Sequence, residues 1–264
     1  IHVYYEQEHA SVRIVDTHTN IVQIEKNWQV IFEDKTTSLE LKADHSALIM
    51  KQIWDFSQTV DIDDVKEILD RQITCNMAIA NEGIHNSYGA NIGHVILNMD
   101  SDCVKTRAKA YAAAGSDARM NGCELPVVIN SGSGNQGITC CVPVVVYAKE
   151  LDCTQEQLYR ALVLSNLTAI YIKTGIGTLS AFCGAVSAGA AAGAGIAYLH
   201  NGTYKEIQHT IVNALAILSG TICDGAKASC AAKIASSVDA GIMGYYMYKL
   251  SLIHISEPTR PRLI

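Results

Sequence analysis

Apolar residues alternate with polar ones, or run together, in three short segments near the amino end of this 264-residue chain. These segments, residues 1–5, 12–15 and 21–24, are rich in β-branched or aromatic side chains, which suit a pleated strand. The second and third segments flank the polar residues 16–20. The pattern therefore predicts a strand followed by a β-hairpin.

Farther along the chain, apolar positions recur every three or four residues, which predicts helices. The first helix is indicated by Ile49, Ile53, Trp54 and Phe56. The second is expected at residues 61–84 with Asp61 as its N-cap. Its apolar face is expected to comprise Val65, Ile68, Leu69, Ile73, Met77 and Ala80. Further helices are expected at residues 104–114, 142–151, 155–169, 180–199, 204–218 and 226–248.

These elements together predict an α+β protein with a small strand-rich part, residues 1–44, and a mainly α-helical domain, residues 45–249. Residues 250–264 continue no helical pattern after Lys249 and contain Pro258 and Pro261. Their sequence resembles a translated sequencing adapter, so we expect a non-native, dispensable tail. We also expect the chain to be an internal fragment of a longer protein, with residues 1–44 truncated.

The composition narrows the class of protein. Charged residues make up 17% and apolar residues 49%, as in a compact globular chain. The net charge of −6, with scattered basic residues, argues against nucleic acid as the main partner. Nine cysteines without a recognisable secretory signal indicate reduced thiols in the cytoplasm. The uncharged stretch 175–199 consists mostly of small residues, so we expect a buried helix and no membrane span.

Three cysteines lie among small residues that allow a bulky inorganic group to approach the backbone. Cys223 and Cys230 flank the segment Asp-Gly-Ala-Lys-Ala-Ser, in which Gly225 is able to adopt positive φ. Cys183 precedes a run rich in alanine and glycine. Three thiolate ligands would leave one iron of a cubane cluster, or one position on zinc, open to a substrate.

A second motif is the glycine-rich segment 130–137, which precedes a helix expected to start near Ile138. Its small residues expose backbone N–H groups, and a following helix adds positive potential, so the segment suits a carboxylate or a phosphate. It lacks the surroundings of a dinucleotide fingerprint and the lysine of a P-loop. A plain connection between helices is the alternative. The candidate ligand-binding residues are Ser131, Gly132, Ser133, Gly134, Asn135, Gln136 and Gly137.

Three motifs in order, residues 130–137, 169–184 and 222–230, resemble the serine dehydratase alpha-chain superfamily, most nearly its L-cysteine desulfidase branch. The resemblance implies a [4Fe-4S] lyase of amino-acid catabolism that works without pyridoxal phosphate. It assigns the cluster to Cys183, Cys223 and Cys230, and the substrate contacts to Ser131–Gly137. The implied reaction converts L-cysteine to sulfide, pyruvate and ammonia, or L-serine to pyruvate and ammonia. The Gly-Cys-Thr-Glu-Pro stretch of such proteins has no counterpart in this chain.

The general base is not identified by the sequence; Lys173 and Lys227 are tentative candidates. A structural zinc-binding or ligand-sensing module without catalysis is the competing interpretation, and a pyridoxal enzyme is disfavoured. The expected partner is a small amino-acid substrate, and self-association into a homo-oligomer stays open. His18 is expected to stabilise a turn or contact substrate. The other cysteines are expected to be small buried apolar residues: Cys75, Cys103, Cys123, Cys140, Cys141 and Cys153.

Overall fold

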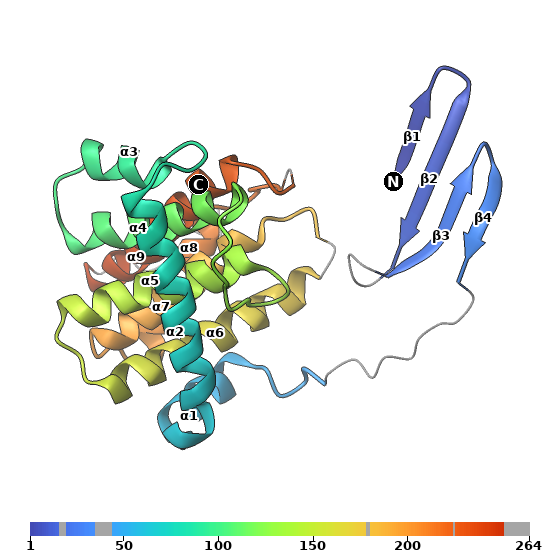
Figure 1. Ribbon diagram of the computed structural model, residues 1–264. Helices are drawn as coiled ribbons and strands as arrows, with labels where there is room; N and C mark the ends of the chain where they lie inside the picture. The colour runs from blue at the N-terminus through green and yellow to red at the C-terminus, as the bar shows by residue number, and fades with distance from the viewer. Residues whose placement is uncertain (16–19, 35–43, 178–179, 224, 251–264) are drawn as a thin grey trace, which may run out of the picture.

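The structure is a computed structural model that describes residues 1–15, 20–34, 44–177, 180–223 and 225–250 (Figure 1). Four antiparallel strands form one sheet in the order β1-β2-β3-β4. The predicted hairpin is confirmed, with Val12 opposite Ile24. The last strand was not predicted, and the turn that contains His18 lies outside the described residues. The strands are β1 (His2–Tyr5), β2 (Glu8–Ile14), β3 (Ile21–Lys26) and β4 (Gln29–Glu33).

Helices make up most of the rest of the described chain, so the predicted α+β class is confirmed. They are α1 (Met50–Thr59), α2 (Ile62–His85), α3 (Ile92–Met99), α4 (Val104–Met120), α5 (Gly134–Glu150), α6 (Gln155–Ile176), α7 (Gly184–Leu199), α8 (Tyr204–Ile217) and α9 (Ser229–Lys249). The sequence did not predict α3, whose short apolar run shows no clear period. The boundary expected near Asp44 falls between β4 and α1, and the division into domains stays a prediction.

The second helix shows both a correct and a wrong prediction. Asp61 caps it as expected, accepting a hydrogen bond from the Asp63 N–H at 3.1 Å. Its buried face, however, is partly polar. Ile68 is 62% exposed, while Gln72 and Asn76 are buried. The prediction considered apolar residues alone and therefore misplaced the buried face of α2. Buried amides that have hydrogen-bond partners also belong to this face.

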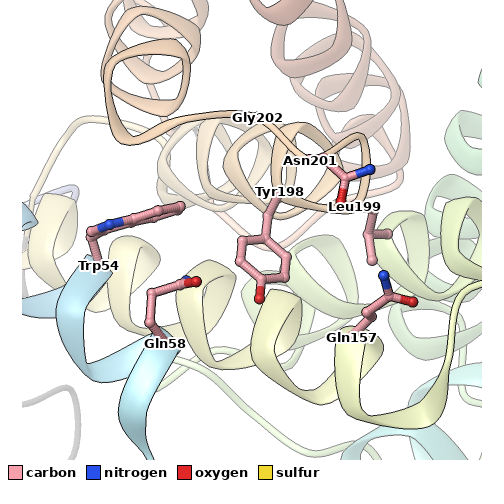
Figure 2. Close-up of a pocket in the computed structure, with 7 residues that line it drawn as sticks. All are labelled: Trp54, Gln58, Gln157, Tyr198, Leu199, Asn201 and Gly202. Carbon is pink, nitrogen blue, oxygen red and sulfur yellow. The ribbon is translucent and has the colours of Figure 1, made fainter.

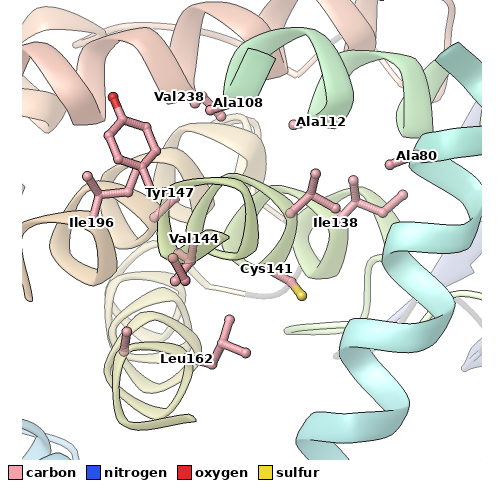
Figure 3. Close-up of a cluster of buried hydrophobic side chains, with 14 of the residues drawn as sticks. Ala80, Ala108, Ala112, Ile138, Cys141, Val144, Tyr147, Leu162, Ile196 and Val238 are labelled. Carbon is pink, nitrogen blue, oxygen red and sulfur yellow. The ribbon is translucent and has the colours of Figure 1, made fainter. Parts of the chain in front are cut away.

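The core lies where α5 passes between its neighbours, and small residues let the helices approach closely (Figure 3). Within α7, a side chain at Gly189 would meet Ser237, and one at Gly193 would meet the backbone of Gly241. The Gln136 side chain lies equally close to Gly184. Gly195 of α7 meets Val144 of α5, so in each pair of helices the residue numbers rise together, and α5, α7 and α9 run parallel.

Two neighbouring helices run the other way. Gly115 of α4 lies against Ile138 of α5, and Arg119 lies against Gly134, so these two helices are antiparallel. Ala161 of α6 lies against Gly195, near the end of α7. One end of the bundle therefore gathers the amino ends of α5, α7 and α9 and the carboxyl ends of α4 and α6.

Of the uncharged stretch 175–199, residues 184–199 form the expected buried helix. This helix is α7, of which nearly every residue is buried by neighbouring helices. In the part of the chain that the structure describes, no helix combines the length and the apolar character that a membrane crossing requires.

Candidate active site

The glycine-rich motif forms a tight turn and the first turn of a helix. Asn130 and Ser133 exchange backbone hydrogen bonds of 3.1 and 3.0 Å around Ser131 and Gly132, both of which have positive φ. The helix starts at Gly134, so the start predicted near Ile138 was wrong. Small residues were taken for a loop, although Ser133 caps this helix. The tip of the turn is accessible, and Gly134, Asn135, Gln136 and Gly137 are buried.

A network of buried and partly buried amides holds this turn in place. Asn130 donates through Nδ2 to Asn166 Oδ1 at 3.0 Å. Asn166 and Gln72 exchange two further hydrogen bonds, each of 2.8 Å. Sequence reasoning missed Gln72 and Asn166. Their only signal was a polar residue at a helical position whose neighbours are buried.

A short antiparallel bridge brings two of the predicted cysteines together. Phe182 pairs with Ile222, the Cys183 N–H donates to Thr221 O at 3.1 Å, and the Cys223 N–H donates to Ala181 O at 2.7 Å. Cys183 and Cys223 each lie one residue beyond the central pair, so their side chains share a face of the bridge. Residues 180–183 were predicted to be helical, which is wrong, because this bridge occupies them.

Cys183 is buried and lies at the amino end of α7. Burial raises the pKa of the Cys183 thiol, and the N–H groups of Ala185 and Val186 act in the opposite direction. The helix has no side-chain cap at this end. Its N–H groups are therefore available to a thiolate or to an anion held beside it.

Cys230 lies in the first turn of α9. The helix starts at Ser229, so the predicted start at residue 226 was wrong; Gly225 has φ of +93° and is not helical. The Cys230 thiol donates to Gly225 O at 3.6 Å. Asp224 lies outside the described residues. Among the residues that the structure describes, no three His, Cys, Asp or Glu side chains form a group able to hold one metal ion.

Cationic side chains surround the two bridged cysteines. Burial lowers the pKa of Lys173, near the end of α6, and the neighbouring Cys223 and Cys183 act in the opposite direction. Lys233 donates to Ile222 O at 3.1 Å and was missed by the sequence. Lys227 lies on the exposed segment before α9. Lys173 thus lies beside the two bridged thiols, and the Lys227 carbonyl accepts from the Cys230 N–H at 3.0 Å.

Gln136 connects the glycine turn with the cysteines. Its side chain lies on Gly184, the residue after Cys183, where an added Cβ would be only 2.6 Å from Nε2. Gln136 is 6% exposed, and its Oε1 has no hydrogen-bond partner among the described residues. A buried acceptor without a donor is costly, so this oxygen is suited to a ligand that carries an N–H or O–H group.

A family model described as "Serine dehydratase alpha chain" matches residues 5–256. The chain belongs to the serine dehydratase alpha-chain family. The match includes residues 250–256 of the segment expected to be a non-native tail. Most of that segment lies outside the described residues, and its origin stays a prediction.

Several bacterial relatives are similar over most of this family member. A UPF0597 protein of Desulfitobacterium hafniense (strain Y51) is 57% identical over 251 residues, 94% of this chain and 58% of the relative. UPF0597 proteins of Lachnoclostridium phytofermentans and Finegoldia magna are 56% and 52% identical, covering 88% and 91% of this chain and 56% and 58% of the relatives. The chain thus spans somewhat more than half the length of these relatives. No solved structure matches.

The remaining cysteines of this dehydratase family member differ in their surroundings. Cys140 and Cys141 are fully buried as predicted, and burial raises the pKa of Cys140 to about 12. Cys75, Cys123 and Cys153 are only partly buried. The prediction of a buried Cys103 was wrong, because it is exposed at the start of α4, 3.3 Å from Thr106 Oγ1.

A separate pocket lies at the opposite end of the bundle (Figure 2). It is lined by Trp54, Gln58, Gln157, Tyr198, Leu199, Asn201 and Gly202. None of these side chains is ionised, so the pocket offers no acid, base or thiolate. The 16-residue α7 separates it from Cys183 by about 24 Å, at 1.5 Å per residue. The candidate active site of this dehydratase relative is therefore the cysteine-bearing end.

Proposed function

We propose that the protein catalyses α,β-elimination from a small L-amino acid, with L-cysteine as first choice and L-serine as second. Family membership supports a serine dehydratase-like lyase. The observation that carries the proposal is the contact of Gln136 with Gly184. It brings the proposed substrate-binding turn directly beside Cys183, so that one small ligand is able to reach both.

The proposed cofactor is a [4Fe-4S] cluster held by Cys183, Cys223 and Cys230. The donor set fits it: two thiols share one face of a bridge, and the third starts a helix whose amino end lies at the same end of the bundle. Lys173 and Lys233 provide positive charge for a cluster with thiolate ligands. Three cysteines would leave one iron without a protein ligand.

A structural zinc site is less well supported. Sulfurs around a tetrahedral zinc lie about 4 Å apart, given zinc–sulfur bonds of about 2.3 Å. The described part of the chain contains no such compact group. A four-iron cluster is wider than a single ion, so its ligands stand farther apart and come from separate helices more readily. Membership of the serine dehydratase alpha-chain family, and not the arrangement of the three cysteines, is what supports the cluster over zinc.

In the proposed reaction, the protein binds the amino acid, orients it and holds the proton that leaves Cα. The turn at Ser131–Gly134 and the amino end of α5 offer N–H groups to the substrate carboxylate. Lys173 is the proposed holder of the Cα proton, with Lys227 as the second candidate. When bound, the cluster would supply a Lewis-acidic iron that stabilises charge on the departing sulfur or oxygen. The aminoacrylate released then hydrolyses to pyruvate and ammonia.

The test is anaerobic reconstitution followed by measurement of iron, colour and pyruvate formation. We expect this chain to be brown with little or no turnover, and a longer homologous protein to form pyruvate from L-cysteine faster than from L-serine. Cys183→Ser, Cys223→Ser and Cys230→Ser should each lower bound iron, whereas Cys153→Ser, at a partly buried site elsewhere, should not. Because this chain spans somewhat more than half of its relatives' length, the assay should include a longer homologous protein. A colourless zinc protein without turnover would contradict the proposal.

A further inference from the structure

Arg119 is a cation at the glycine turn that no motif singled out. It lies in the last turn of α4, partly buried, and its Nη1 donates to Asn135 Oδ1 at 3.2 Å. Its Nε lies only 2.3 Å from where a Cβ on Gly134 would be. Any side chain at Gly134 would therefore displace this guanidinium. The glycine there keeps Arg119 against the amino end of α5.

Two other arginines of the bundle contrast with it, because each has a carboxylate partner. Arg107 binds Asp102 and Glu150 at 2.5 and 2.6 Å, and Arg160 binds Glu156 at 2.9 Å. No carboxylate in the described part of the chain lies within ion-pair distance of Arg119. A guanidinium has five N–H donors, so Arg119 retains donors for a ligand.

Two independent features point to an anionic ligand with an adjacent donor group. The amino end of α5 adds positive potential beside Arg119. On the same first turn, Gln136 is 6% exposed and its Oε1 lacks a partner among the described residues. Arg119 reaches this first turn from α4, and Gln136 extends from it toward α7, so a ligand lying over the amino end of α5 would span the two, with its carboxylate at Arg119 and its ammonium group at Gln136. An α-amino acid carries these two groups two bonds apart.

We propose that Arg119 is a substrate-binding residue that holds the α-carboxylate of the amino acid, with Gln136 Oε1 accepting from its ammonium group. The identity of the ligand rests on the proposed function. The fork of N–H groups in arginine matches a carboxylate better than the single ammonium of lysine does. Arg119 would thus select α-amino acids over amines and amides of the same size.

The test measures binding without turnover. L-Alanine has both charged groups but no leaving group at Cβ, and L-alaninamide lacks only the carboxylate. By titration calorimetry on the anaerobically reconstituted chain at pH 7, we expect L-alanine to bind at least about tenfold more tightly than the amide. Arg119→Gln should abolish this preference, and Arg119→Lys should retain part of it.

Arg107→Gln is the matched control, since it removes a cation from the same helix about 18 Å away. It should leave both affinities unchanged. An undiminished preference in Arg119→Gln, or an equal loss in Arg107→Gln, would overturn the proposal. If Arg119→Gln does not fold, as judged by circular dichroism, Arg119→Lys decides: a preference equal to that of the unmodified chain contradicts the proposal.

The outcome for Arg119 can be distinguished from the outcome for the proposed elimination reaction. If the chain binds L-alanine through Arg119 but the longer homologous protein forms no pyruvate from L-cysteine or L-serine, the binding assignment stands and the elimination fails. If pyruvate forms at the same rate and KM in Arg119→Gln, the elimination stands and the role of Arg119 fails.

Discussion

Helices that start at the two ends of the bundle are capped in different ways. At the end that carries the pocket, α6 and α8 start with capping boxes, in which Thr154 pairs with Gln157 and Thr203 with Glu206. At the other end, α7 and α9 start without any side-chain cap. The capping boxes thus satisfy N–H groups of α6 and α8, whereas at the second end Ser133 caps only α5, and the first N–H groups of α7 and α9 have no side-chain partner.

The glycines of the two regions also serve different purposes. Within the bundle, Gly189 and Gly193 are required because another helix occupies the place of a side chain. At the cysteine end, Gly132 and Gly225 have open space around them and positive φ, which favours glycine. Close packing in the middle fixes the relative position of α7 and α9. The exposed turns at their ends are then free to surround a ligand.

The largest effect is expected in the middle of the bundle, where α7 packs closely against α9. Gly193→Ala would place a methyl group 2.7 Å from the backbone of Gly241, which cannot rotate away as a side chain does. We expect a loss of about 3 kcal/mol in the free energy of unfolding, measured in urea. Gly175→Ala in α6 is the matched control, because nothing lies within 4 Å of the added methyl group. It should stabilise the chain by about 0.5–1 kcal/mol. Similar changes in both variants would show that the middle is not tightly packed.

These two kinds of glycine explain where the sequence predicted the structure and where it did not. Periodic apolar residues were sufficient to find α6 and α8. The predicted starts of α5 and α9 were wrong, because the glycines within residues 134–137 indicated a loop and the alanines within residues 226–228 indicated a helix. The first set is helical and buried, whereas the second precedes its helix. Only the neighbouring helices distinguish them.

The candidate site was predictable in its motifs and not in its supports. The cysteines and the glycine turn stand out by composition. Arg119 reaches the turn from α4, and Asn166 reaches it from α6. Neither has a motif of its own, because its role depends on the antiparallel packing of helices distant in sequence. Such contacts belong to tertiary structure and leave no periodic signal.

An intermediate effect is expected at the end of the bundle that carries the pocket and the two capping boxes. Thr203→Ala and Thr154→Ala should each cost about 1 kcal/mol at pH 7. The two boxes should differ in acid. The Thr203 N–H donates to Glu206 Oε2 at 2.6 Å and lowers the pKa of this carboxyl below its usual 4.5. The stabilisation is therefore complete above about pH 4.5 and is lost as pH falls through the lowered value.

Urea unfolding between pH 3 and 7 checks this difference. Glu206→Gln should remove part of the acid dependence of the free energy of unfolding. Gln157→Ala should leave that dependence unchanged, since the amide of Gln157 does not titrate. An unaltered pH profile in Glu206→Gln would mean that the box does not persist in solution.

The smallest effect on stability is expected at the cysteine-bearing end of the bundle. Cys183 is the N-cap of α7, with an extended backbone of φ −70° and ψ 117° that suits a serine cap. In the metal-free chain, Cys183→Ser should change the free energy of unfolding by less than about 0.5 kcal/mol, because a new cap hydrogen bond offsets the burial of the hydroxyl. Cys141→Ser, in the interior of α5, gains no cap and should lose about 1 kcal/mol or more. Unfolding of both variants in urea without iron measures this contrast. Equal losses would make Cys183 a packing residue like Cys141, whereas a stable Cys183→Ser chain that binds less iron would show that this position serves ligation rather than folding.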